Sequence, residues 1–275
     1  MLIINDVSGM KEFIEKVRGK IIGLVPTMGC LHQGHLSLIR RAREQCDVVV
    51  VSIYVNPTQF APGEDFDTYP RDFEHDRKMC EEADAIFYPD NNEMYPEGYK
   101  TYVTVEGITK VLCGRSRPAH FRGVTTVVAK LFNIIKPSMA YFGQKDYQQS
   151  LVIRRMAKDL NMDVEIVTCP TVRDRDGLAV SSRNRYLNKE QREEAAVLYS
   201  SLKLAQDLIA KGVENTDSIK DDVIKKIRTT SGIIDYVEIL DKETLKPLKK
   251  IIQGSTLIAL AVRFGSTRLI DNLIL

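Results

Sequence analysis

The stretch GLVPTMGCLHQGHLSLIRRA, residues 23–42, decides the fold. An apolar run that starts at Ile21 ends at Pro26, Gly29 follows, and apolar residues at helical spacing resume at Leu36. The next stretch, DVVVVSIYVN at residues 47–56, is β-branched and almost uninterrupted, which is typical of a strand covered on both faces. Strand, helix and strand within about 35 residues form one βαβ unit, so the sequence predicts a parallel sheet.

Later segments extend this pattern as far as residue 172. Apolar runs predict strands at 85–89, 139–143 and 164–170, and weak alternation predicts an edge strand at 102–107, with helices at 123–137 and 145–160 between them. We therefore predict an α/β fold with a doubly wound, Rossmann-like parallel sheet over residues 1–172. The charged helical stretches at 189–211 and 217–229, followed by strands at 236–241 and 255–275, predict a second, smaller α+β domain over 173–275. We expect this domain to close over a site on the first one.

Composition favours an ordinary globular protein of 275 residues, with 44% hydrophobic and 28% charged residues. The net charge of +2 argues against an obligatory nucleic-acid partner, which usually requires a basic face. No apolar run approaches the ~18 residues of a membrane span. Five scattered cysteines, with no zinc-site spacing and no signal peptide, indicate reduced thiols, so we expect a cytoplasmic protein.

Two of the four histidines, His32 and His35, stand three residues apart where the first βαβ strand gives way to its helix. In an open parallel sheet, ligands bind beyond the carboxyl ends of the strands, where helix N-termini also point. Imidazoles at this place can donate hydrogen bonds to a phosphate chain. A helix cap, or a metal site completed by ligands from elsewhere in the chain, remains possible from this motif alone.

Several long motifs occur in one order: PTMG with LH-GH-LSL, YVNPTQF, HFRGV, YFGQKDYQQ, DGLAVSSRNRYL and AVRFGSTRLIDN. Together they closely resemble the pantothenate synthetase (pantoate–β-alanine ligase) family of the HxGH nucleotidyltransferase-like superfamily, over essentially the whole chain. The resemblance implies ATP-dependent ligation of pantoate and β-alanine through an enzyme-bound pantoyl adenylate, with release of AMP and pyrophosphate. It also implies a homodimer. Mg²⁺ is expected as a cofactor because ATP chemistry normally needs a cation that bridges the phosphates, and charge and hydropathy lead us to expect no nucleic acid and no membrane as partner.

The resemblance further implies an ATP site built from three segments. It assigns catalytic roles to His35, His32, Lys145 and Arg183, with both histidines as hydrogen-bond donors to the phosphates. The implied ATP-binding residues are Met28, Gly29, Cys30, Leu31, His32, Gln33, Gly34, His35, Gly143, Gln144, Lys145, Asp146, Val172, Val180, Ser181, Ser182 and Arg183.

For pantoate, the resemblance implies the side-chain amides of Gln59 and Gln149, which can serve a hydroxyl and a carboxylate without a charge. Arg117 and His120 are weaker candidates for contact with pantoate or β-alanine. Asp76 matches a position suggested for metal contact, but His75 stands where some relatives carry a second carboxylate, which leaves the Mg²⁺ ligands open.

Two other functions compete with this one. Another HxGH nucleotidyltransferase would move a nucleotide onto a phosphorylated substrate, and it would not need Gln59 and Gln149 around a carboxylate. A nucleotide-sensing or RNA-binding module would show a basic face and would lack the catalytic histidines.

Overall fold

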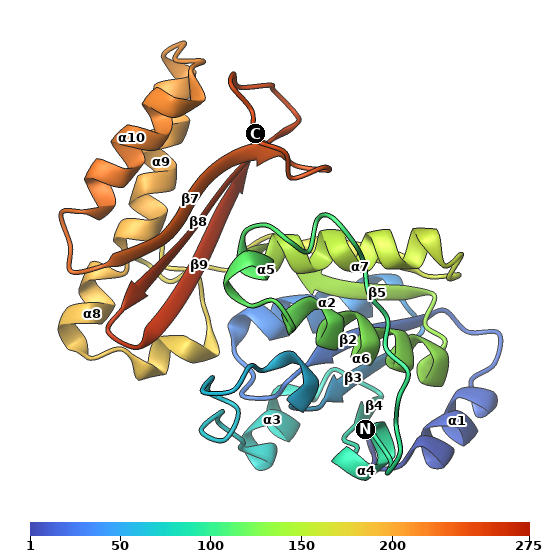
Figure 1. Ribbon diagram of the computed structural model, residues 1–275. Coiled ribbons are helices and arrows are strands. Elements are labelled where there is room, and N and C mark those ends of the chain that lie inside the picture. Colours follow the sequence, from blue (N-terminus) through green and yellow to red (C-terminus); the bar gives the residue numbers. More distant parts are fainter. The chain divides into compact units, whose positions relative to one another are not determined.

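The computed structural model describes residues 1–275, which form two compact units (Figure 1). The first unit comprises Met1–Gln144 and Gln148–Pro170, and the second comprises Lys145–Tyr147 and Thr171–Leu275. Three residues from the middle of the first unit's sequence, Lys145–Tyr147, therefore belong to the second unit. The boundary expected after residue 172, and the expectation that the C-terminal part closes over the active site, stay predictions.

The first unit is built on a six-stranded sheet in which every pair is parallel. Its strand order is β1-β4-β3-β2-β5-β6, as the doubly wound prediction requires. The strands are β1 (Leu2–Ile4), β2 (Ile22–Thr27), β3 (Val48–Ile53), β4 (Ala85–Phe87), β5 (Met139–Gly143) and β6 (Glu165–Cys169).

Alternate residues of β3 enter two different hydrophobic cores, one on each face of the sheet. Val48 and Val50 join the core formed with helices α1 (Val7–Lys16), α6 (His120–Ile135) and α7 (Tyr147–Asp159). Val49 and Val51 join the core formed with α2 (Gln33–Gln45). All six residues of β3 are buried, which explains why its sequence carries no polar face. The other helices and 3₁₀ turns of this unit are η1 (Pro57–Gln59), α3 (Phe73–Met79), α4 (Asn91–Met94) and α5 (Cys113–Ser116). The turn η2 (Gln144–Asp146) and the first residue of α7 lie at the division between the units.

The strand order reverses between β2 and β5. From β2 the chain builds outward through β3 to β4, and it later returns to place β5 on the other side of β2. In sheets of this kind the crevice at such a switch point, beyond the carboxyl ends of the strands, is where ligands bind. The loop at residues 28–32 leaves β2 at this edge, and Gln144 leaves β5 there.

The predicted edge strand at 102–107 is wrong, because these residues form no strand. Instead, helix α6 satisfies part of the backbone: the Val103 N–H donates to Oγ1 of Thr126 at 3.0 Å, and Oγ1 of Thr125 donates to the Val103 carbonyl at 2.6 Å. Two threonine side chains thus take the place of a neighbouring strand. The sixth strand of the sheet is β1, at the N-terminus.

The second unit is an antiparallel sheet of order β7-β8-β9 with helices packed on it. The stretch expected as one helix over 189–211 is two helices, since the chain turns at Ala195 and Ala196. Its elements are η3 (Ser182–Tyr186), α8 (Lys189–Glu194), α9 (Val197–Ala210), α10 (Thr216–Ile227), β7 (Ile233–Asp241), β8 (Thr256–Phe264) and β9 (Thr267–Ile274).

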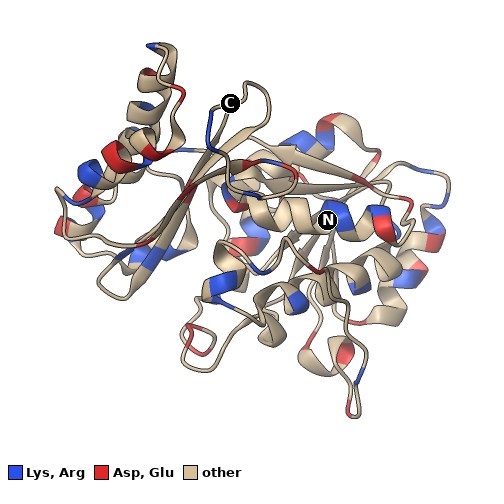
Figure 2. Cartoon of the chain, turned by 45° about the horizontal axis from the view of Figure 1, so that its top comes forward, with Lys and Arg blue, Asp and Glu red and all other residues tan.

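Residues of both charge signs are interspersed along the helices of both units (Figure 2), in keeping with the small net charge. None of the helices combines the length and the apolar character that crossing a membrane requires.

Candidate active site

The loop after β2 has an unusual backbone. Gly29 and Cys30 both have left-handed φ angles, +79° and +51°, and this region costs a non-glycine residue about 1–2 kcal/mol. A Cβ at position 29 would lie 2.7 Å from Oδ2 of Asp76, so the position requires glycine. Successive backbone N–H groups in such a turn point to one side and form a nest that attracts an anion.

The protein supplies that anion itself, from helix α3. Oδ2 of Asp76 accepts from the N–H of Cys30 at 2.9 Å, and Oδ1 accepts from the N–H of Leu31 at 2.7 Å. The Asp76 side chain is 1% exposed. Burial raises the pKa of Asp76, and the two backbone hydrogen bonds counteract only part of this rise. Since Asp76 occupies the nest, the loop is anchored to helix α3 by these two amides.

His75 holds the same loop from the other direction. Its Nε2 lies 3.2 Å from the carbonyl oxygen of Leu31, so it donates there when the proton is on Nε2. A carboxylate at position 75 could not make this bond. Among all residues of the chain, no group of three or more His, Cys, Asp or Glu side chains is placed to hold a metal ion. A metal-binding role for Asp76 stays a prediction.

His32 and His35 form a reciprocal cap on helix α2. Nδ1 of His32 accepts from the N–H of Gly34 at 3.1 Å, and Nδ1 of His35 accepts from the N–H of His32 at 3.3 Å. The two rings stack with centroids 4.0 Å apart. Because both Nδ1 atoms accept, each neutral ring carries its proton on Nε2. The capping role weighed from the sequence is therefore present, and it also fixes the tautomer.

Gln59 ends the 3₁₀ turn η1 and is almost fully buried. Its Nε2 donates to Sδ of Met28 at 2.7 Å, and its Oε1 accepts from Nδ2 of Asn56 at 3.1 Å. Asn56 also donates to the Gly123 carbonyl at 3.1 Å. A Cβ at Gly123 would lie 2.4 Å from the Thr58 carbonyl oxygen, so the glycine allows α6 to approach this turn. Sequence reasoning missed Asn56, although an Asn-Pro pair at a strand end signals a turn.

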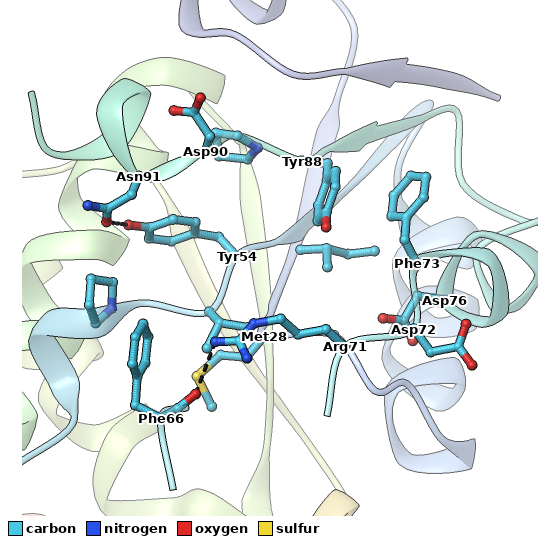
Figure 3. Close-up of a pocket in the computed structure, with 15 residues that line it drawn as sticks. Met28, Tyr54, Phe66, Arg71, Asp72, Phe73, Asp76, Tyr88, Asp90 and Asn91 are labelled. Carbon is cyan, nitrogen blue, oxygen red and sulfur yellow. Dashed lines mark hydrogen bonds between the residues drawn. The ribbon is translucent and has the colours of Figure 1, made fainter. Parts of the chain in front are cut away.

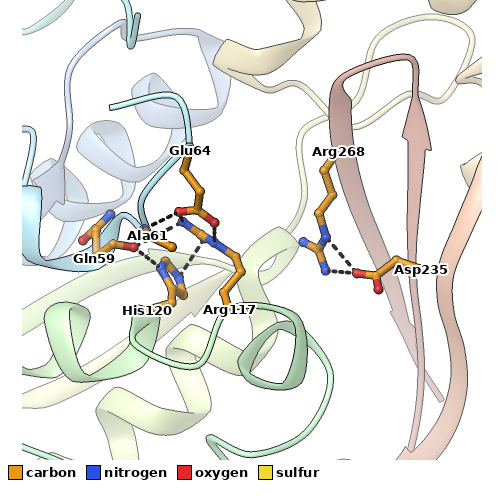
Figure 4. Close-up of polar contacts among 7 residues, drawn as sticks. All are labelled: Gln59, Ala61, Glu64, Arg117, His120, Asp235 and Arg268. Atoms are coloured by element: carbon orange, nitrogen blue, oxygen red, sulfur yellow. Dashed lines mark hydrogen bonds and ion pairs between the residues drawn. The ribbon is translucent and has the colours of Figure 1, made fainter. Parts of the chain in front are cut away.

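Arg117 and His120 contact the main chain at Gln59 (Figure 4). Arg117 binds both carboxylate oxygens of Glu64 at 2.6 Å, and its Nη2 donates to the Gln59 carbonyl at 3.2 Å. Nδ1 of His120 lies 3.1 Å from the same carbonyl, which fits a donor at this atom. Burial alone would raise the pKa of Glu64, but hydrogen bonds from Arg117 and Ala61 lower it below its ordinary value. Both candidates thus support Gln59.

A cavity of about 490 Å³ borders the loop at Met28 and Gly29 (Figure 3). Aromatic rings form much of its wall, and the rings of Phe73 and Tyr88 stack with centroids 4.4 Å apart. Its lining residues are Met28, Gly29, Ile53, Tyr54, Val55, Pro57, Phe66, Arg71, Asp72, Phe73, Asp76, Tyr88, Pro89, Asp90 and Asn91.

Two adjacent glutamines at the start of α7 have different surroundings. Gln148 is 6% exposed; its Oε1 accepts from the N–H of Cys113, and its Nε2 donates to the carbonyls of Ile108 and Val111 at 2.8 and 2.7 Å. Gln149 is half-buried, and its amide makes no hydrogen bond within the protein. Only Gln149 therefore keeps its amide available for a substrate.

The second unit contains the other predicted ATP segment. Residues 172–180 form a tight hairpin in which the N–H of Val180 donates to the Val172 carbonyl at 3.0 Å, so two predicted residues eight positions apart are neighbours. Ser181 caps η3 by accepting from the N–H of Arg183 at 3.3 Å. Ser182 and Arg183 open that turn.

The predicted residues after β5 lie on either side of the unit division. Gly143 ends β5, and Gln144 begins η2 in the first unit. Lys145 and Asp146 belong to the second unit, where Nζ of Lys145 lies 3.6 Å from a carboxylate oxygen of Asp146. The structure thus brings residues 28–35 together with Gln59 and Asp76 in one unit, and Lys145 together with the 172–183 segment in the other. Convergence of the two sets on one ATP molecule stays a prediction.

Comparison with known proteins gives a consistent result. A sequence model of the family described as Pantoate-beta-alanine ligase matches residues 2–274. Two curated relatives, the pantothenate synthetases of Acetivibrio thermocellus and Thermotoga petrophila, are each 57% identical to the chain. The alignments cover all of this chain and 99% and 100% of those proteins.

Solved structures agree with the sequence relatives. The crystal structure of pantothenate synthetase from Thermus thermophilus superposes with a TM-score of 0.95 at 45% identity and covers 99% of both chains. Pantoate-beta-alanine ligase from Francisella tularensis, solved in complex with beta-gamma ATP and β-alanine, gives a TM-score of 0.83 at 34% identity. That alignment covers 100% of this chain and 97% of the other.

Proposed function

Because the chain belongs to the pantoate–β-alanine ligase family, and is thus an ATP-dependent ligase of pantoate and β-alanine, we propose that it works through an enzyme-bound pantoyl adenylate. A pantoate carboxylate oxygen attacks the α-phosphorus of ATP, and the bond to the β-phosphate breaks to release pyrophosphate. The β-alanine amine then attacks the acyl carbon, loses a proton, and displaces AMP.

The fixed tautomers of His32 and His35 carry this proposal. With both Nδ1 atoms accepting from the backbone, the neutral rings carry their protons on Nε2, at the N-terminus of α2 and at the switch point of the sheet. Donors of this kind stabilise the charge that develops on the phosphates and need not give up their protons. His35 and His32 are therefore assigned as electrostatic catalysts.

No covalent enzyme intermediate is needed. Burial raises the pKa of the thiols of Cys46 and Cys169, and it raises the pKa of Cys80 to about 12, which keeps these cysteines protonated and unreactive. Catalysis then rests on positioning the reactants and on stabilising the phosphates.

The amides of Gln59 and Gln149 would bind pantoate. Gln59 is oriented by Asn56 and by the Arg117–Glu64 pair, and Gln149 keeps its amide available. In the second unit, Lys145 and Arg183 would bind the phosphates, while Ser181, Ser182 and the backbone at Val172 and Val180 would complete the ATP site.

Mg²⁺ would accompany ATP. The carboxylates near the loop do not fit a protein-built cage, since both oxygens of Asp76 already accept backbone hydrogen bonds and no ligand cluster surrounds it. Phosphate oxygens and water would supply the coordination. We also propose a homodimer, as the family resemblance implies, and a cytoplasmic location, as the scattered cysteines suggest; light scattering of the purified protein tests its oligomeric state.

The test is the exchange of labelled pyrophosphate into ATP. The proposal requires exchange that depends on pantoate and proceeds without β-alanine, and AMP release in turnover only when both substrates are present. An enzyme that releases AMP but shows no pantoate-dependent exchange would exclude a reversible adenylate as the intermediate.

A further inference from the structure

We infer that Asn272 and Asp271, in the last strand, are positioning residues that hold the two phosphate-binding segments of the second unit in one frame. This inference rests on the proposed function, because it takes Lys145 and the segment at 172–183 as parts of the ATP site. The motif RLIDN at 268–272 is part of the last segment that resembles the family, and its polar residues lie outside the predicted ATP and pantoate sites.

Asp271 and Asn272 interrupt the alternation of buried and partly exposed residues along β9. Both are buried, at 2% and 4% exposure. Successive side chains in a strand point to opposite faces of the sheet, so these two residues serve different faces. A buried carboxylate is costly unless it is paired and hydrogen-bonded, so the partners of this pair indicate its purpose.

On one face, Asp271 binds the base of the hairpin. Nη1 and Nη2 of Arg173 donate to its two carboxylate oxygens at 2.6 and 2.9 Å. The same guanidinium donates to the Gly177 carbonyl at 3.1 Å and lies 4.2 Å from the ring centroid of Tyr199. Arg173 thus links the strand, helix α9 and the turn of the hairpin that leads into Ser181.

On the other face, Asn272 binds the segment Lys145–Tyr147. Its Nδ2 donates to the Lys145 carbonyl at 3.0 Å, and its own N–H donates to Oδ1 of Asp271 at 2.8 Å. The hydroxyl of Tyr147 donates to the Lys242 carbonyl at 3.1 Å, which fixes the other end of the segment. A continuous series of contacts therefore runs from Lys145 through Asn272, Asp271 and Arg173 to the hairpin.

The consequence concerns the first half-reaction. Lys145 and Arg183 act on ATP phosphates, and a reacting group displaced by about 1 Å can cost 10²-fold in rate. Aminolysis of the finished adenylate involves no pyrophosphate. Loss of the Asn272 amide should therefore impair adenylation far more than aminolysis.

The experiment compares Asn272→Ala and Asn272→Leu with wild type in two assays: pantoate-dependent pyrophosphate exchange, and aminolysis of supplied pantoyl adenylate by β-alanine. We expect exchange kcat/KM for ATP to fall by about 10-fold or more, with aminolysis within about two-fold of wild type. Asn272→Leu keeps nearly the same side-chain shape without a donor or a buried charge, so it decides the matter if the alanine variant does not fold.

The matched control is Thr216→Val. Thr216, 3% exposed in the same unit, donates from its hydroxyl to the Leu248 carbonyl at 2.6 Å, so the variant removes a comparable buried hydrogen bond elsewhere. Equal losses in both assays, or normal exchange by a folded Asn272 variant, would overturn the inference. Absence of exchange in wild type would instead count against the proposed function itself.

Discussion

Substitution of Asp76 by asparagine tests how the active-site loop is held. Asp76 accepts the N–H groups of Cys30 and Leu31 at 2.9 and 2.7 Å. Oδ1 of an asparagine can keep one of these bonds, but its Nδ2–H₂ group would face the other N–H. A hydrogen bond to a charged group contributes about 1.5–3 kcal/mol, and an unsatisfied buried donor costs about 1–3 kcal/mol.

The substitution also removes the unfavourable burial of a charge, which is the cause of the raised pKa of Asp76, and this offsets part of the loss. We therefore expect Asp76→Asn to lower the free energy of unfolding by about 2 kcal/mol. Displacement of His32 and His35 with the loop should lower exchange kcat/KM by about 10²-fold. Urea denaturation and pyrophosphate exchange measure the two effects.

The control is Asp6→Asn, the same chemical change at an exposed N-cap of α1 that accepts from the N–H of Gly9 at 2.7 Å. Asparagine caps helices as well as aspartate, so this variant should behave like wild type. If Asp76→Asn kept normal stability and exchange, the loop would not depend on this carboxylate. If excess Mg²⁺ restored its exchange, Asp76 would be a metal ligand and the anchoring argument would fail.

Three further predictions concern single side chains. Gln149→Ala should raise KM for pantoate and leave the free energy of unfolding unchanged. Gln148→Ala should lower the free energy of unfolding by about 2 kcal/mol, because it removes the partner of three partly buried backbone groups; the opposite assignment in substrate titration and urea denaturation would contradict the surroundings described. His35→Ala should lower kcat by about 10²–10³-fold, and a near-normal kcat would remove its assigned role. Because folding lowers the pKa of Glu64, the stability that its carboxylate contributes is complete above the ordinary pKa of 4.5 and is lost as the pH falls through the lowered pKa of the folded state. The free energies of unfolding of Glu64→Gln and wild type should therefore differ at pH 7 and converge in acid. A difference that stays constant with pH would refute this.

The fold could be predicted because its signals are local. The apolar run of β3 and the helical spacing of apolar residues in α6 can each be recognised within about 20 residues of sequence. The alternation of strands and helices then indicates a parallel sheet. The strand predicted at 102–107 failed because its backbone partners are Thr125 and Thr126, two ordinary-looking residues of α6. No pattern in a single sequence reveals a helix that replaces a strand.

The site was only partly predictable for a similar reason. His32 and His35 stand at a strand end, so position alone pointed to them. The anchoring role of Asp76 depends on its contacts with Cys30 and Leu31, which are more than 40 positions earlier in the chain. The difference between Gln148 and Gln149 depends on which side of one helical turn faces the core. Residue type cannot distinguish neighbours that are chemically identical.

The assignment of Lys145–Tyr147 to the second unit limits how the gene of this protein can recombine with the gene of a relative. A crossover at codon 170 would look harmless, since it separates two compact bodies. It would nevertheless join a C-terminal half from one parent to a tripeptide from the other, and the Lys145–Asn272 and Tyr147–Lys242 hydrogen bonds would have to form between foreign sequences. A breakpoint before codon 145 would keep these contacts within one parent. That breakpoint would, however, take β6 from one parent and β5 from the other, and it would separate α7 from the core it packs in. No single breakpoint keeps both units within one parent, because the chain passes between them more than once.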